Sequence, residues 1–270
     1  MKPRAVILDL FGDHLRYHGG GARTQVLVAL LEVFGVGEPT ARIALARMRK
    51  EGWFATHRQA RQVAWTLTDK SWRLLDEGRA RIFSRAGGPW DGQWRMVIYA
   101  MAEQHRAQRD RLRRNLSWLG FGPLATATWI SPHDRLDRVE QALSETAGVR
   151  ADLLTCRSRS PMSDLDMVDR CWDLKALGRA YEDLVRRLEA LPPAEELAAL
   201  PGPVALRQRI ELVADYRHFP FRDPDLPAEL LPADWPGTRA HQLFMAAHEA
   251  LGAPADAYVT SLLERHGDGT

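Results

Sequence analysis

The sequence predicts a multidomain α+β protein, and three observations support this prediction. Its 270 residues exceed what one compact core usually holds, and 45% of them are hydrophobic, enough for large buried cores. Hydrophobic residues recur at helical spacing in some segments and alternate at strand spacing in others. Strand-like runs occur only within residues 1–168, whereas residues 169–270 have helical spacing. We therefore expect three consecutive domains, at 1–86, 87–168 and 169–270.

Residues 1–86 have the pattern of three helices, a hairpin and a further helix. An apolar run opens the series, and Val26 and Leu30 share one face of the next helix. A short turn follows, and Pro39 suits the start of the third helix because its missing N–H needs no partner there. Two helices, a short turn, a basic third helix and a basic hairpin predict a winged helix-turn-helix.

The predicted third helix, residues 38–51, has one apolar and one basic face. Ala41, Leu45 and Met48 fall on the apolar face at helical spacing. After Gly52, two short runs alternate between apolar and polar residues and each contains a tryptophan. Period-two alternation in both runs predicts a hairpin, and its connection is basic.

We expect this unit to bind double-stranded DNA. A guanidinium on the exposed face of such a helix can donate two hydrogen bonds to guanine O6 and N7, and cations on the hairpin suit phosphates or the minor groove. Both Arg42 and Arg47 qualify as a base reader, and Ile43 suits either a thymine methyl or packing on a neighbouring helix. Each of these residue types also suits a solvated surface. The predicted DNA-binding residues are Thr40, Arg42, Arg47, Lys50, Arg58 and Arg61.

The charge distribution agrees with DNA binding at one end of the chain. Residues 1–84 hold 14 Lys and Arg against 8 Asp and Glu, a net charge of +6, although the whole chain carries only +2. The remaining residues are therefore net negative. A polyanion such as DNA would meet the N-terminal part alone, although a charge bias can also serve only to solvate a surface.

Strands and helices alternate in residues 87–168. Apolar runs at 94–101 and 122–131 predict two strands with an amphipathic helix between them, and a third strand follows at 149–159 after a second helix. This order favours a small ferredoxin-like α/β middle domain. Residues 169–270 contain long amphipathic segments separated by two proline-rich connections, which predicts a helical C-terminal domain.

Composition narrows the classes of protein further. No apolar run approaches the roughly 20 residues of a membrane span, and the N-terminus has no signal-peptide cleavage region. Cys156 and Cys171 are the only cysteines and form no CxxC pair, which is typical of a reduced, cytoplasmic protein. We expect neither a cofactor nor a metal site.

Several unusual stretches together resemble the phenylacetic acid degradation repressor family, the PaaX-like transcriptional regulators. They are LFGDHLRYHGGG, ARIALARMRKEGW, WDGQWRMVIYAM with RDRLRRNLSWLGFGPL and WISPHD, and YRHFPFRDPDLPAELLPADWPG. The resemblance runs almost from end to end. It implies a winged-helix domain, a ferredoxin-like middle domain, a helical C-terminal domain and a homodimer. It also implies repression of catabolic genes from an inverted-repeat operator until an aryl-acyl-CoA, typically phenylacetyl-CoA, releases the protein.

The last of these stretches has two interpretations. As an effector site, Arg217 and Arg222 would bind the phosphates of a CoA ester while Phe219 and Trp235 line an apolar pocket. As a structural connection, Asp223 would cap a turn and pair with Arg222. The sequence favours the structural interpretation, and the four candidate effector residues are Arg217, Phe219, Arg222 and Trp235.

Two other functions compete with repression. A metal-dependent nuclease of the small ferredoxin-like type needs a carboxylate directly after the first middle strand, but this chain has Ala100 there. His248 lies in HEALG, which lacks the second histidine of HExxH. We therefore expect no catalytic residues and no enzymatic activity. The second competing function is a winged-helix module that binds another protein.

Overall fold

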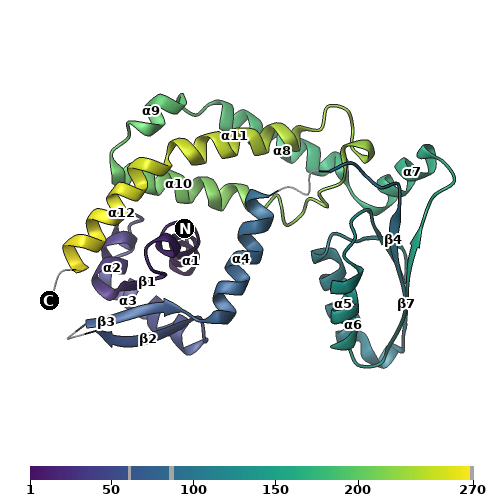
Figure 1. The fold of residues 1–270 in the computed structure, drawn as a ribbon, viewed down its shortest axis with the longest axis horizontal. Helices are drawn as coiled ribbons and strands as arrows, with labels where there is room; N and C mark the ends of the chain where they lie inside the picture. Colours follow the sequence, from purple (N-terminus) through teal and green to yellow (C-terminus); the bar gives the residue numbers. More distant parts are fainter. Residues whose placement is uncertain (60–61, 85–87, 268–270) are drawn as a thin grey trace. The chain divides into compact units, whose positions relative to one another are not determined.

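A computed structural model of the chain describes residues 1–59, 62–84 and 88–267 (Figure 1). The chain forms two compact units that do not follow sequence order. Among the described residues, unit 1 comprises 1–84, 185–218 and 240–267, and unit 2 comprises 88–184 and 219–239. The C-terminal third of the sequence, which we expected to be one domain, is thus divided between the two units.

The N-terminal part of unit 1 contains the predicted helices and hairpin (Figure 1). Its sheet has the antiparallel order β1-β3-β2, and β1 is a short strand that the sequence did not predict. In order, the elements are α1 (Pro3–Asp13), η1 (Leu15–Tyr17), β1 (Gly21–Arg23), α2 (Thr24–Glu32), α3 (Glu38–Lys50), β2 (Phe54–Gln59), β3 (Gln62–Leu67) and α4 (Asp69–Phe83).

Helices from the C-terminal part complete the core of unit 1. They are α9 (Ala194–Ala198), α10 (Gly202–Tyr216), part of α11 (Pro236–Ala250) and α12 (Gly252–Gly267). Helix α10 lies against α1 and α12 lies against α2 (Figure 1). One hydrophobic cluster joins Leu10 and Leu31 to Leu206 and Val259, all of them fully buried. The N-terminal helices therefore do not form a core by themselves.

Close backbone approach brings α10 and α12 together. A Cβ atom at Gly202 would lie 2.6 Å from the Cβ of Tyr258 and 3.1 Å from the carbonyl oxygen of Pro254. No other residue fits there without a shift of the helices, so glycine at this position fixes how closely α10 and α12 approach.

Unit 2 is built on a four-stranded antiparallel sheet of order β5-β6-β4-β7. Its elements are β4 (Trp94–Met101), η2 (Glu103–His105), α5 (Arg106–Trp118), β5 (Gly122–Ala125), β6 (Thr128–Ser131), α6 (Leu136–Ser144), β7 (Val149–Cys156), α7 (Pro161–Cys171) and η3 (Ala228–Leu230). The order β4-α5-β5-β6-α6-β7 fits the ferredoxin-like fold. Helices α8 (Leu174–Glu189) and α11 carry the chain between the units.

One prediction for this sheet was wrong. The run at 122–131 is not one strand but the hairpin β5–β6, in which Ala125 pairs with Thr128. A two-residue turn separates the strands. Apolar periodicity continues through such a turn, which is why the sequence alone did not reveal it. The hydrophobic stripe of the first helix is confirmed, because Leu112 and Leu116 of α5 are fully buried against the sheet.

Candidate nucleic-acid interface

Helix α3 has favourable residues at both ends. Its first turn contains Glu38, and its last turn contains basic residues, so both ends complement the helix dipole. Gly52 ends the helix with φ of 80°, a conformation that favours glycine. The N–H of Trp53 then donates to the carbonyl of Met48 at 2.9 Å, which satisfies a carbonyl of the last turn and directs the chain into β2.

The exposed face of α3 is the one that the sequence predicted. Ala41, Leu45 and Met48 are buried, whereas the side chains of Arg42 and Arg47 are 54% and 79% exposed. Thr40 and Lys50 are also exposed. Ile43 is 70% exposed, so it does not pack on a neighbouring helix within the chain. The helix therefore presents an exposed basic face that includes the apolar side chain of Ile43.

Both arginines are held by glutamates of their own helix or its end. Arg42 pairs with Glu38 at 2.7 Å, and Arg47 pairs with Glu51 at 2.9 Å. The hydrogen bond from Arg47 lowers the pKa of Glu51, which keeps that carboxylate ionised. Exposed pairs of this kind contribute only about 0–1 kcal/mol, so a stronger anionic partner can displace the glutamates.

The β2–β3 hairpin follows α3 directly. Phe54 pairs with Leu67 and Arg58 pairs with Val63, while Phe54 and Leu67 anchor the base of the hairpin in the core. Arg58 is exposed. Arg61, the second predicted hairpin contact, lies outside the described residues.

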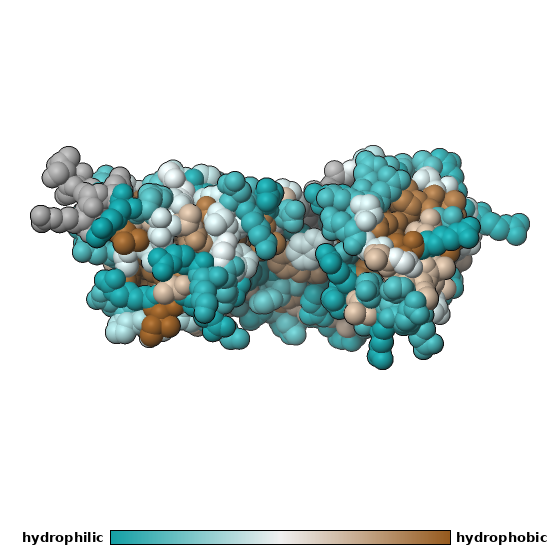
Figure 2. All heavy atoms as spheres, turned by 90° about the horizontal axis from the view of Figure 1, so that it is seen from below, coloured by the Kyte–Doolittle hydropathy of each residue, from teal (hydrophilic) through white to brown (hydrophobic). Residues whose placement is uncertain are grey.

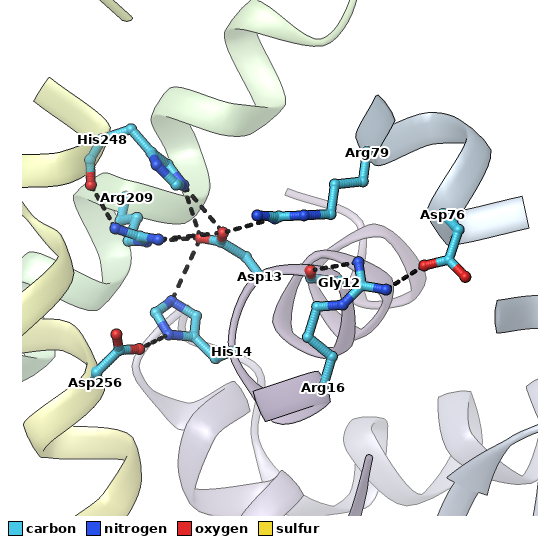
Figure 3. A network of polar contacts seen from close by, with 9 residues as sticks. All are labelled: Gly12, Asp13, His14, Arg16, Asp76, Arg79, Arg209, His248 and Asp256. Carbon is cyan, nitrogen blue, oxygen red and sulfur yellow. Dashed lines mark hydrogen bonds and ion pairs between the residues drawn. The ribbon is translucent and has the colours of Figure 1, made fainter. Parts of the chain in front are cut away.

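A buried ionic network holds the helices of unit 1 together at Asp13 (Figure 3). Asp13, at the end of α1, is 4% exposed. It accepts hydrogen bonds from Arg209 Nε of α10 at 2.7 Å, and His248 Nε2 of α11 lies 3.0 Å from its Oδ1. His14 Nε2 lies 3.6 Å from Asp13, and its other ring nitrogen contacts Asp256 of α12 at 2.5 Å. The carboxylate thus links α1 to α10 and α11, and His14 links the end of α1 to α12.

The environment of Asp13 keeps it ionised. Burial by itself raises the pKa of this carboxyl, but hydrogen bonds and charges from His248 and Arg209 outweigh that effect and hold the pKa well below its usual range. Asp9, one turn earlier, behaves in the opposite way. Burial raises the pKa of Asp9 to about 7, more than the opposing charge of Arg217 lowers it.

Comparisons with known proteins identify the family. Family models match three consecutive stretches, a PaaX-like protein model at 2–71, the PaaX protein central Cas2-like domain at 87–168 and the PaaX-like protein C-terminal domain at 172–261. The chain is 32% identical over 263 residues to the transcriptional repressor PaaX of Escherichia coli strain K12, covering 95% of this chain and 82% of that protein. The chain belongs to the PaaX family.

A solved structure also resembles this PaaX-family chain. The uncharacterized protein Rv0674 from Mycobacterium tuberculosis superposes with a TM-score of 0.66 and is 26% identical, covering 95% of this chain and 98% of that one. The resemblance that four sequence stretches suggested is therefore confirmed, and the central Cas2-like domain agrees with the ferredoxin-like order of unit 2.

The structure does not bring the four candidate effector residues of this PaaX-family chain into one unit. Arg217 belongs to unit 1 and pairs with Asp9 at 2.5 Å. Phe219 and Trp235 belong to unit 2, where both rings pack against Tyr181, at centroid distances of 4.7 and 5.8 Å. Arg222, also in unit 2, is exposed. Their role in binding an effector stays a prediction.

The structural interpretation of the same stretch is confirmed in one respect. Asp223 is buried, and its Oδ1 accepts a hydrogen bond from the N–H of Asp225 at 2.8 Å, which caps a turn. Its Oδ2 accepts another from the Tyr181 hydroxyl at 2.8 Å. The turn is therefore fastened to α8.

Two short stretches of the sequence, LFGDH and HEALG, meet in the Asp13 network. LFGDH and HEALG were noted for family resemblance and for a missing zinc motif, yet they supply Asp13 and His248 to one site. Within the described ranges, no three His, Cys, Asp or Glu side chains are placed to share a metal ion. In the same part of the chain, every helix is too short or too polar to cross a bilayer.

We expect Asp13→Asn to destabilise unit 1 strongly. The substitution leaves the buried guanidinium of Arg209 uncompensated, which typically costs about 3–5 kcal/mol. The pKa of Asp13 is lower in the folded protein than the unfolded value of 3.8, so its ionisation stabilises the fold above that pH. This contribution is lost as pH falls below 3.8, so the difference between wild type and variant should shrink in acid.

Urea unfolding at pH 7 and at pH 3, followed by circular dichroism, measures this effect. Asp76→Asn is the matched control, because Asp76 is an exposed carboxylate that pairs with Arg16 at the surface, and its removal should cost less than about 1 kcal/mol. Equal losses for the two variants would contradict the role given to Asp13.

Proposed function

We propose that this chain is a DNA-binding transcriptional regulator, a repressor of aromatic catabolism genes of the phenylacetate type, and not an enzyme. The observation that carries the proposal is the exposed basic face of α3 beside the exposed Arg58 of the hairpin. The 32% identity to the Escherichia coli repressor over nearly the whole chain supports the same function.

In this proposal the N-terminal elements act as a winged helix-turn-helix. Helix α3 enters the major groove as recognition helix, and the β2–β3 hairpin is the wing. Arg42 or Arg47 exchanges its glutamate for a guanine edge, and Ile43 faces a thymine methyl. Thr40 near the helix start, Lys50 at its end and the wing arginines Arg58 and Arg61 contact phosphates.

The regulator is proposed to act as a homodimer on an inverted repeat. One winged helix offers few base contacts, so two copies should bind half-sites on one face of the DNA, roughly 34–36 Å or a multiple apart. Footprinting of the promoter of its own operon, together with sedimentation of the free protein, tests this arrangement. A micromolar monomer that protects a single asymmetric site would refute it. Intact DNA after long incubation with Mg²⁺ or Mn²⁺ would separate this function from a nuclease.

Arg42→Ala and Arg58→Ala should have different effects on DNA binding. If Arg42 reads a base, its loss weakens operator binding by about 1–3 kcal/mol and relaxes the preference at one base pair. Arg58 on the hairpin contacts phosphate, so its loss weakens binding to all sequences alike and flattens the salt dependence by about one unit of slope. The Lys50→Ala variant should behave like Arg58→Ala.

Gel shifts with operator and random DNA over a range of salt concentrations measure these differences. Arg113→Ala on α5 is a control for the loss of one exposed positive charge outside unit 1, and it should leave DNA affinity unchanged. If Arg42→Ala weakens binding to operator and random DNA equally, Arg42 does not read a base.

The proposed effector is an aryl-acyl-CoA such as phenylacetyl-CoA. A ligand lowers operator occupancy only through its preference for the conformation that does not bind DNA, and a tenfold change needs about 1.4 kcal/mol of coupling. We expect phenylacetyl-CoA to weaken operator binding at least about tenfold and free CoA to do so much less. Titration of acyl-CoA esters into a preformed protein–operator complex measures this. Lack of release by every ester would remove the sensing role and leave DNA binding in place.

A further inference from the structure

Unit 2 contains a surface cavity of about 660 Å³ beside α7. It lies where the chain leaves β7 and enters α7, next to the first residues of β4. Its volume is in the range of roughly 300–1,000 Å³ that is typical of small-molecule sites. Its lining includes three methionines, a cysteine and two arginines: Met96, Met162, Met167, Cys156, Arg157 and Arg159.

The fold creates this cavity because helices cover the two faces of the sheet unequally. Helices α5 and α6 bury Val97 and its neighbours on one face. On the other face the α7 region covers only the start of β4, where the indole N–H of Trp94 donates to Asp164 at 2.7 Å. Met96 is half-buried and Ile98 is exposed. The cavity lies along β4, between the part of the strand that the α7 region covers and the part that is exposed.

The charges at the cavity favour an anion. Arg170 pairs with Asp166 at 3.3 Å, but Arg157 and Arg159, both exposed, form no ion pair within 4 Å among the described residues. Arg157 is near enough to help lower the pKa of Asp91, although the hydrogen bond from Arg95 is the main cause of that shift. Guanidinium groups bind phosphate with two parallel hydrogen bonds.

The rest of the lining favours an apolar group. Met162 is 75% exposed, and Met96 and Met167 are half-buried beside it. Thioether side chains are flexible and polarizable and adapt to ligands of different shape. Ile98 and Leu154 extend this apolar surface over the open face of the sheet, and Figure 2 shows hydrophobic residues gathered on the surface of unit 2. Exposed apolar surface of this kind typically marks a binding site.

We infer that this cavity binds a phosphorylated ligand with an apolar group, its phosphates at Arg157 and Arg159 and its apolar end against the three methionines. The inference rests on the proposed function, because an aryl-acyl-CoA is the ligand of this chemistry that the proposal names. It assigns the effector to residues that none of the sequence motifs indicated.

Two other surfaces of unit 2 are weaker candidates. Arg113 and Arg114 are also exposed cations, but they lie on α5, which does not line the cavity beside α7. The uncovered sheet face could instead meet a second copy of the chain. Arg157 and Arg159 favour an anionic ligand over a second copy of the chain. In a contact between two copies, these arginines would face the same arginines of the other copy or its apolar surface, and neither offers a negative charge.

The double variant Arg157→Gln/Arg159→Gln tests the inference, with Arg113→Gln/Arg114→Gln as the control of equal charge loss. Calorimetry without DNA should show that the first variant binds phenylacetyl-CoA at least about tenfold more weakly, while the control binds like wild type. Free CoA should bind the wild type more weakly than the ester, because it lacks the apolar group. All four arginines are exposed, so both variants should fold like wild type, and sedimentation checks the oligomeric state of each.

A thiol reaction gives an independent measurement. Cys156 lines the cavity and is half-buried, whereas Cys171 is buried and burial raises the pKa of its thiol to about 11. A maleimide should therefore label Cys156 first, and saturating phenylacetyl-CoA should slow that labelling.

The outcomes separate this inference from the proposed function. Weakened binding in the Arg157/Arg159 variant alone, with slowed labelling of Cys156, supports the cavity, even if the ester does not release operator DNA. The inference is overturned if both double variants lose the same affinity for phenylacetyl-CoA, or if the wild type does not bind the ester at all. It is also overturned if bound ester leaves the labelling rate of Cys156 unchanged, or if the Arg157/Arg159 variant changes oligomeric state but keeps its affinity for the ester. Release of operator DNA by phenylacetyl-CoA, tested separately, decides the proposed regulation.

Discussion

Unit 1 depends on a charge that is buried between distant parts of the chain. The carboxylate of Asp13 is stable inside the protein only because Arg209 and His248 donate hydrogen bonds to it. These partners come from α10 and α11, so α1 must meet both helices in one arrangement. The elements that follow α1, which we propose bind DNA, are consequently part of one unit with helices from the end of the chain.

That arrangement has a consequence for regulation. Because α10 and α12 share the core of α1 and α2, a ligand cannot loosen the N-terminal helices without disturbing the C-terminal ones. Helices α8 and α11 continue from one unit into the other.

The charged groups of the two units differ in their pairing. On α3, Arg42 and Arg47 are paired with neighbouring glutamates that a stronger anion can replace, and the helix is fixed by a buried apolar face. At the cavity of unit 2, Arg157 and Arg159 have no such partner among the described residues. Paired arginines suit the DNA-binding surface that we propose, whereas cations without an ion pair beside an apolar lining suit the phosphorylated ligand that we propose for unit 2.

The sequence by itself determined the features that depend on local periodicity. The spacing of Ala41, Leu45 and Met48 fixed which face of α3 is buried, and therefore that Arg42 is exposed, because a helix turns by the same angle at every residue. The Leu112 stripe of α5 and the strand at β4 followed in the same way.

Only the tertiary structure decided where charged and polar side chains with distant partners lie. Asp13 meets His248, 235 residues later, and Arg217, for which the sequence left both a ligand-binding and a structural role open, pairs with Asp9. The division of the C-terminal helices between two units was equally hidden. Periodicity shows that a face is apolar but not which other face covers it, and the environment of an ionisable group is set by partners that the chain brings near only when it folds.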